Sequence, residues 1–156
     1  MDRIDIKILG ILRKNARITN RDLAEELGLP ASSTLERVRK LEKNGIIQGY
    51  EAKIDSRKLG LALTVFIGIK TNEKIGETGV GEKLAELPEI CGLYDVGGEY
   101  NYFARVVVAD TDELCELMGR MGKIRGVMDS RTTLVLHTIK EDLSVEVRDE
   151  NAVGPN

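Results

Sequence analysis

The sequence predicts an α+β fold with two modules, an N-terminal winged helix-turn-helix domain and a C-terminal βαββαβ domain of the ferredoxin-like type. The first observation is a pair of short helical stretches that meet near Gly28 and Pro30, a spacing typical of a helix-turn-helix. The second is a change of apolar period after residue 61, where strand-like and helix-like stretches alternate. The third is charge, because residues 1–60 carry a net charge of +4 and residues 61–156 a net charge of −7. A basic module tolerates phosphates, whereas an acidic one does not.

Composition limits the classes of protein. The chain has 156 residues, of which 42% are hydrophobic and 31% charged, as in folded domains. No apolar run approaches the ~18–20 residues that span a bilayer, and the start lacks a signal-peptide pattern. We therefore expect a cytoplasmic protein with no membrane partner. Cys91, Cys115 and the single His137 lack metal-ligand spacing, so no metal, cofactor or catalytic residue is predicted.

The first helix is expected from about Asp2 to Asn15. Its isoleucine and leucine residues recur on one face, while Asp2 and Asp5 lie in the first turn, where the helix dipole favours negative charge. We expect this helix to complete a three-helix core by packing on the two helices that follow.

Two further helices are expected between residues 19 and 45. Thr19 suits the N-cap of the second helix, and Gly28 can end it at positive φ. Pro30 precedes the third helix, and the pair Asn44-Gly45 ends it. The narrow apolar face of the third helix consists of Leu35, Val38 and Leu41.

The opposite face of the third helix carries hydroxyls and charges. Cations can hold phosphates, and polar side chains can reach base edges in a DNA major groove. A solvated amphipathic helix would look the same in isolation, but the helix-turn-helix spacing favours DNA binding. The candidate DNA-binding residues are Ser32, Ser33, Glu36, Arg37, Arg39, Lys40 and Lys43.

After the third helix, residues 46–54 alternate like a strand and predict a small wing or a strand that leaves the domain. The turn-rich residues 55–60 mark a boundary. We therefore expect a DNA-binding domain over residues 1–50, a linker over 51–61, a second domain over 62–142 and a tail over 143–156.

The second domain is expected to hold four strands and two helices. The strands are predicted over residues 63–71, 90–97, 101–109 and 127–140, and the helices begin near residues 78–80 and 110–111. This order predicts an antiparallel sheet with both helices on one face. Both alternating sets of side chains in the first, third and fourth strands are largely apolar. The uncovered face should therefore need a partner, so the sequence predicts an oligomer.

Taken together, these features resemble the leucine-responsive regulatory protein (Lrp/AsnC) family of prokaryotic transcription regulators. The resemblance covers residues 2–140. It rests on five sequence segments that occur in this order: IDIKIL, LAEELGL, RVRKLEKNGIIQGYEAKID, GGEYNYFARV and RGVMDSRTTLVL. It implies a RAM/ACT-like second domain and a dimer built through the C-terminal sheets, which can assemble further into tetramers or octamers. It also implies a small-molecule effector, typically an amino acid, bound at the interfaces between dimers.

The resemblance also supplies candidate effector-binding residues. The family motif Gly-x-x-Asp has Asn101 in the place of its Asp, so a neutral carbonyl replaces a carboxylate that could pair with the ammonium group of an amino acid. The two tyrosines either line the effector cleft or pack at the sheet edge, and the two threonines are equally explained by strand propensity. The candidates are Gly98, Tyr100, Asn101, Tyr102, Thr132 and Thr133.

Two departures from the family pattern lie in the third helix. It starts with Pro30-Ala31 where the family usually has Ser-Pro, which predicts altered capping. Glu36 stands where the family often has a basic or polar residue. A carboxylate repels phosphate but can accept a hydrogen bond from cytosine N4, which predicts an unusual operator preference.

The predicted function is a sequence-specific transcription regulator, without enzymatic activity, that binds double-stranded DNA as a homo-oligomer and responds to an effector. Three alternatives remain open. The chain could be an architectural protein that coats DNA without an effector, or a lone effector module that acts on partner proteins. It could also be an enzyme resembling siroheme decarboxylases, which share the architecture. Tetrapyrrole chemistry would be expected to need several His or Arg residues in the cleft, and this chain has a single His.

Overall fold

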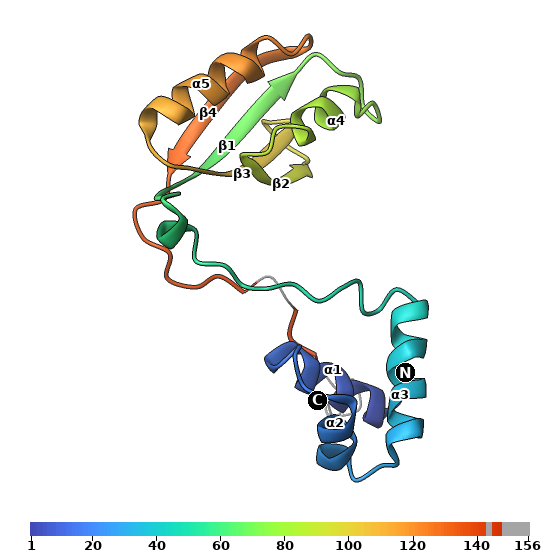
Figure 1. Ribbon diagram of the computed structural model, residues 1–156. Helices are drawn as coiled ribbons and strands as arrows, with labels where there is room; N and C mark the ends of the chain where they lie inside the picture. Colours follow the sequence, from blue (N-terminus) through green and yellow to red (C-terminus); the bar gives the residue numbers. More distant parts are fainter. Residues whose placement is uncertain (143–144, 148–156) are drawn as a thin grey trace, which may run out of the picture. The chain divides into compact units, whose positions relative to one another are not determined.

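The computed structural model describes residues 1–142 and 145–147, and these residues form two compact units (Figure 1). Unit 1 comprises residues 1–53 together with residues 140–142 and 145–147, and unit 2 comprises residues 54–139. The chain therefore enters unit 1 twice. Of the tail predicted over residues 143–156, only residues 145–147 lie within the described part of the chain.

Unit 1 is built from three helices, α1 (Arg3–Lys14), α2 (Asn20–Leu27) and α3 (Ala31–Lys43). A capping box starts α1, since the Asp2 carboxylate accepts from the amides of Ile4 and Asp5 while the Asp5 carboxylate accepts from the Asp2 amide. The hydroxyl of Thr19 caps α2. Gly28 ends α2 with a φ of 66°, in the left-handed region that glycine adopts at least cost.

One apolar cluster, assembled from all three helices, forms the core of unit 1. Its buried members are Ile8, Leu12, Leu23, Val38 and Leu41. The expected three-helix core is therefore present, but the predicted phase of α3 was wrong at one position. Thr34 is fully buried, whereas Leu35 is only half-buried. The Thr34 hydroxyl donates to the Pro30 carbonyl at 3.2 Å, so its polar atom is satisfied in the core.

After α3, residues 46–54 do not form the predicted strand, since residues 46–47 are bends and residues 48–54 have no regular secondary structure. The amides of Ile46 and Ile47 both donate to the Leu41 carbonyl, which closes the end of the helix. A strand needs a hydrogen-bonded neighbour, and the described residues of one chain supply none along this segment.

Unit 2 contains a short 3₁₀ helix, η1 (Ser56–Leu59), and an antiparallel sheet with the predicted βαββαβ order. The strands lie in the order β2 (Ile90–Asp95), β3 (Tyr102–Val108), β1 (Leu63–Thr71) and β4 (Val127–Leu134). The helices α4 (Gly79–Ala85) and α5 (Thr111–Gly122) lie on one face of this sheet (Figure 1). The strands β1, β2 and β3 each begin and end within two residues of their predicted bounds.

The fourth strand is shorter than predicted, because β4 ends at Leu134 and not at residue 140. It pairs only with β1, and the first residues of β1 lie opposite Leu134 and Val135. Leu63, the first residue of β1, falls opposite residue 136 in this register, so among the described residues those after 136 have no strand to pair with.

One set of alternating side chains faces the helices and forms the core of unit 2. Val65, Ile67 and Ile69 of β1 are fully buried there, against Leu84 of α4 and Leu117 of α5. The opposite face carries no helix among the described residues of unit 2. We call this opposite side the uncovered face.

The uncovered face has an aromatic centre and a polar margin. Phe66 and Phe103 stack with ring centroids 5.9 Å apart, and Tyr94 lies directly opposite Phe103 on β2. The prediction that β4 would be apolar on this side was wrong. Its outward residues, which pair with Lys70, Gly68 and Phe66 of β1, are Asp129, Arg131 and Thr133.

Candidate nucleic-acid interface and ligand-binding loop

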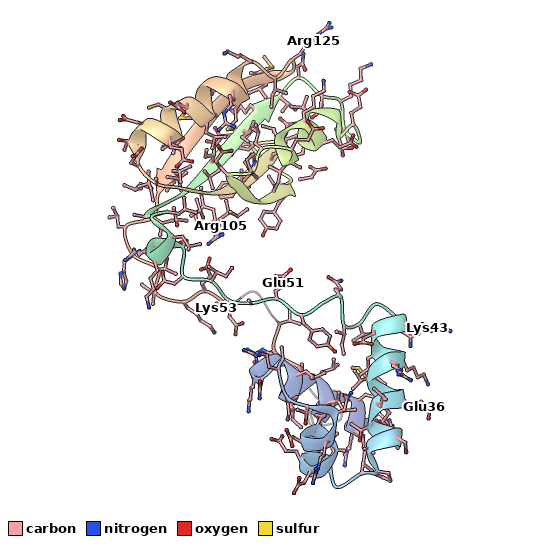
Figure 2. The ribbon with its side chains drawn as sticks, in the orientation of Figure 1. Glu36, Lys43, Glu51, Lys53, Arg105 and Arg125 are labelled. Atoms are coloured by element: carbon pink, nitrogen blue, oxygen red, sulfur yellow. The ribbon has the colours of Figure 1, made fainter. Side chains whose placement is uncertain are left out.

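The outer face of α3 presents a row of polar and charged side chains. Figure 2 shows Glu36 and Lys43 projecting from the side of α3 that faces away from α1 and α2. Burial of Val38 and Leu41 against those helices fixes this orientation. Ser33 and Arg37 are half-buried, and the exposed predicted DNA-binding residues are Ser32, Glu36, Arg39, Lys40 and Lys43.

The beginning of α3 carries no carboxylate. Pro30 occupies the N-cap position without a side-chain hydrogen bond, and the first turn contains no acidic residue. The first amides of a helix carry partial positive charge, which an acidic cap would offset. The positive end of α3 therefore lies beside the exposed hydroxyl of Ser32.

Arg37 is placed differently from the other predicted DNA-binding residues. Its Nη1 atom lies 2.7 Å from Oδ2 of Asp2 and 2.8 Å from Oδ1 of Asp5, so the guanidinium joins α3 to the start of α1. A hydrogen bond from the Asp5 amide and the Arg37 guanidinium lower the pKa of Asp2, and the two carboxylates raise the pKa of Arg37. Sequence reasoning missed this pairing, because Asp2 and Asp5 already had an explanation in the helix dipole.

We expect Arg37→Ala to lower the melting temperature of unit 1 at neutral pH, because it removes the ionic connection between α1 and α3. The folded-state pKa of Asp2 lies below its ordinary value of 3.8, so the pairing stabilises fully above that pH. It is lost as the pH falls further, through the folded-state pKa. Melting curves followed by circular dichroism, for wild type and variant, should therefore differ at neutral pH and converge in acid.

The control for this prediction is Lys40→Ala, which removes an exposed cation from the same helix. It should melt like the wild type at both pH values. An Arg37→Ala protein that is as stable as the wild type at neutral pH would contradict a structural role for the pairing.

In unit 2, the predicted effector residues lie in and around the turn between β2 and β3. Gly98 has a φ of 128°, which only glycine adopts readily. Tyr100 packs flat on β1, where a Cβ atom at Gly68 would lie 2.8 Å from its ring. Lys70 extends along the same surface, with its Nζ 5.6 Å from the Tyr100 ring centroid and 3.3 Å from Oε1 of Glu99.

Asn101 connects this turn to the end of β1 through two hydrogen bonds. Its side-chain Oδ1 accepts a hydrogen bond from the Thr71 amide at 2.8 Å, and its own amide donates to the Ile69 carbonyl at 2.9 Å. The neutral carbonyl that replaces the family's carboxylate is thus bonded to the backbone of its own chain.

Tyr102 lies in the core beneath α4 and is 4% exposed. Its hydroxyl donates to Oε2 of Glu73 at 2.9 Å, while Oε1 of Glu73 accepts from the Val80 amide at 2.6 Å in the first turn of α4. Burial and the Glu73 carboxylate raise the pKa of Tyr102 to about 12. Glu73 was not among the predicted site residues, and no spacing in the sequence marks it as the partner of Tyr102.

We expect Tyr102 to lose its proton after the other tyrosines in an alkaline titration followed by tyrosinate absorbance. Its pKa rises from 10.0 to about 12 on folding, so the hydroxyl stabilises the fold below pH 10 and this contribution disappears as the pH approaches 12. Tyr102→Phe should remove the latest-titrating tyrosine from the curve. A variant that keeps that last step would contradict the assignment.

The two predicted threonines point to opposite sides of the sheet, as neighbours on a strand must. Thr132 faces α5, where its Oγ1 lies 3.8 Å from Sδ of Met118, and Thr133 lies on the uncovered face opposite Phe66. Tyr100 shares the uncovered face, whereas Tyr102 is in the core. The six predicted effector residues therefore do not converge on one point within a single chain.

Neither a metal centre nor a membrane segment is found in the described part of the chain. Among residues 1–142 and 145–147, no three His, Cys, Asp or Glu side chains gather in a way that could hold a metal ion. Cys91 and Cys115 are exposed free thiols. None of the described helices combines the length and apolarity that crossing a bilayer requires.

Comparison with known proteins matches both halves of the chain. Residues 1–48 match the model of the winged helix-turn-helix DNA-binding family, and residues 64–145 match that of the Lrp/AsnC ligand binding domain. The chain is 36% identical over 146 residues to the leucine-responsive regulatory protein of Escherichia coli, covering 90% of this chain and 88% of the relative. It is 33% identical over 149 residues to the HTH-type transcriptional regulator FL11 of Pyrococcus horikoshii, covering 95% and 97%.

A solved structure gives the same result at the level of the fold. A transcriptional regulator from Neisseria meningitidis, in complex with L-Met, superposes with a TM-score of 0.86 at 28% sequence identity. The match covers 93% of this chain and 96% of that one.

Proposed function

The chain belongs to the Lrp/AsnC family of transcription regulators, and on that premise we propose that it binds specific sites in double-stranded DNA as a homo-oligomer. We further propose that a small-molecule effector of the amino-acid class changes its assembly and its DNA affinity. The main support for DNA binding is the outer face of α3, where five exposed polar and charged side chains follow a helix start without a side-chain cap.

For DNA binding, the N-terminal half of α3 would enter the major groove and its C-terminal half would approach the backbone. Arg39, Lys40 and Lys43 are exposed cations suited to phosphates, and Ser32 and Glu36 are exposed groups suited to base edges. A dimer presents two copies of α3. Its site would therefore contain two half-sites about one helical turn, or a multiple of it, apart.

For the oligomer, we propose that the uncovered faces of two chains pack together. Four of the six aromatic residues lie on this face, which is an unusual share for a surface left in water. The side chains are Phe66, Tyr94, Tyr100 and Phe103. We infer from them a dimer through the C-terminal sheets, with tetramers or octamers as further assemblies.

For the effector, the support is the ligand-binding domain of the family and the L-Met complex of the similar Neisseria regulator. The predicted residues lie on both faces of the sheet and in the turn, so a site made from them would combine residues from more than one chain. Such a site would couple effector binding to assembly, because the effector binds only the state that brings the residues together. The proposed function involves no catalytic step and no cofactor. It places the protein in the cytoplasm, where it would bind DNA.

The test is selection of bound duplexes from a random pool at moderate salt, followed by competition with nonspecific DNA. A palindromic consensus with a large specificity ratio, at least about a thousand-fold, would support a site-specific regulator. If the affinity depends on the salt concentration alone and no sequence is enriched, the proposal of a site-specific regulator is contradicted and an architectural protein is favoured. Repeating the competition in the presence of each common amino acid tests the effector separately.

A further inference from the structure

We propose that Glu36 determines sequence specificity by accepting a hydrogen bond from the N4 amino group of a cytosine in the major groove. The binding site would then carry a C·G pair at one fixed position of each half-site. This inference rests on the proposed function, because it requires α3 to lie in the major groove.

The position of Glu36 suits a base contact. It is the sixth of the 13 residues of α3, one turn after Ser32 and one turn before Lys40. Its side chain is exposed and projects from the outer side of the helix (Figure 2). Residues in the N-terminal half of a recognition helix approach base edges most closely.

The carboxylate of Glu36 is not used by the protein itself. Three other acidic residues in or beside α3 are engaged, since Asp2 and Asp5 bind Arg37 and Glu42 accepts a hydrogen bond from Tyr50. Within the described residues, Glu36 has no hydrogen bond or ion pair. Because Arg37 is held by α1, the cation next to Glu36 in the sequence does not neutralise it.

The chemistry of the carboxylate then restricts what it can bind. An ionised carboxylate only accepts hydrogen bonds, and phosphates repel it. Guanine presents the acceptors N7 and O6 in the major groove, and thymine presents O4 beside a methyl group. Adenine has a donor at N6, but its acceptor N7 lies alongside and repels the second carboxylate oxygen. Cytosine presents the N4 donor without an acceptor on the same base, so it is the base that fits.

The experiment compares sequence selection by the full-length wild type, Glu36→Gln and Glu26→Gln. Glutamine can bind adenine at N6 and N7 together, so Glu36→Gln should change one symmetric position from C·G to A·T and leave the others unchanged. Glu26 is an exposed carboxylate on α2, and Glu26→Gln makes the same change of charge. That control should bind all DNA slightly more tightly and select the wild-type consensus.

A base analogue tests the hydrogen bond directly. Replacing the selected cytosine by 2-pyrimidinone removes the N4 amino group and, with it, one Watson–Crick hydrogen bond to guanine, so Glu36→Ala on the same duplex is the reference for the effect on the base pair. Wild-type affinity should fall roughly ten-fold or more, while the affinity of Glu36→Ala should be indifferent to the substitution.

The outcomes separate this inference from the proposed function. If wild type and Glu36→Gln select the same consensus, or if wild type tolerates the analogue, the role of Glu36 is overturned and the site-specific regulator stands. If the wild type binds DNA but selects no consensus, the role of Glu36 and the proposed site-specific function are both contradicted.

Discussion

Replacing Phe103 by aspartate is expected to convert the proposed oligomer into monomers and to weaken binding to a two-half-site operator by about a hundred-fold or more. Phe103 is 36% exposed and stacks on Phe66 at the centre of the uncovered face. A carboxylate there would lose water when it packs against Phe66 and a second chain, and burying a charged group costs several kcal/mol where no partner compensates it. Light scattering would report the mass of the assembly, and gel-shift titration the affinity.

The matched control is Ile75→Asp, which adds the same charge to unit 2 at a fully exposed apolar residue in the loop between β1 and α4. It should stay oligomeric and keep the wild-type affinity. On a duplex with a single half-site, Phe103→Asp should bind as the wild type does, since each α3 is unaltered. A Phe103→Asp protein that remains oligomeric, with its melting curve intact, would contradict pairing through this face.

Local sequence signals were sufficient for most of the helical unit. The Asp2 capping box, the Thr19 cap and the glycine at positive φ each act over a few residues, so the bounds of α1 and α2 follow from short spacings. The predicted packing phase of α3 was wrong at one position. Three-residue spacing places Leu35 and Val38 on one face, but the observed core uses Thr34, Val38 and Leu41, because burial of a threonine is feasible when its hydroxyl bonds to the helix backbone.

The strand order of unit 2 was also predictable, because apolar runs alternate with amphipathic stretches of suitable length. The length of β4 was not. The polar character of its outward residues Asp129, Arg131 and Thr133 is visible in the sequence, so the expected apolar set there was a misjudgement of the pattern. A strand extends only as far as its neighbour, and the limit that β1 sets on β4 is a tertiary property. The strand predicted after α3 is absent for a related reason, because an alternating pattern indicates that a segment can pair but does not supply the neighbouring strand.

The candidate sites show where sequence reasoning ends. Helical periodicity correctly placed Glu36, Arg39, Lys40 and Lys43 on an exposed surface. It could not show that Arg37 pairs with residues more than thirty positions away. The effector candidates came from the resemblance to a family. That resemblance does not reveal that the Tyr102 hydroxyl bonds to Glu73 in the core. Nor does it reveal that Thr132 and Thr133 lie on opposite faces of the sheet.

Removing the three exposed cations of α3 together is expected to weaken DNA binding strongly and to reduce its dependence on salt. The variant is Arg39→Ala with Lys40→Ala and Lys43→Ala. The slope of log K against log salt becomes shallower by about 0.9 for every phosphate that the protein no longer neutralises. Since a dimer carries two copies of α3, the slope should fall by up to about 5. Arg37 should contribute little to this slope, because its guanidinium is paired within unit 1.

The control lowers the net charge by the same three units in the other half of the chain, at the exposed residues Lys74, Lys83 and Lys123. Replacing these by alanine should leave the salt slope unchanged, because unit 2 is not expected to contact phosphate. The two variants thus separate local contacts from the overall charge of the protein. The α3 variant should also select the wild-type consensus from a random pool, since Ser32 and Glu36 remain. Equal slopes for both variants would show that net charge, and not the outer face of α3, governs DNA binding.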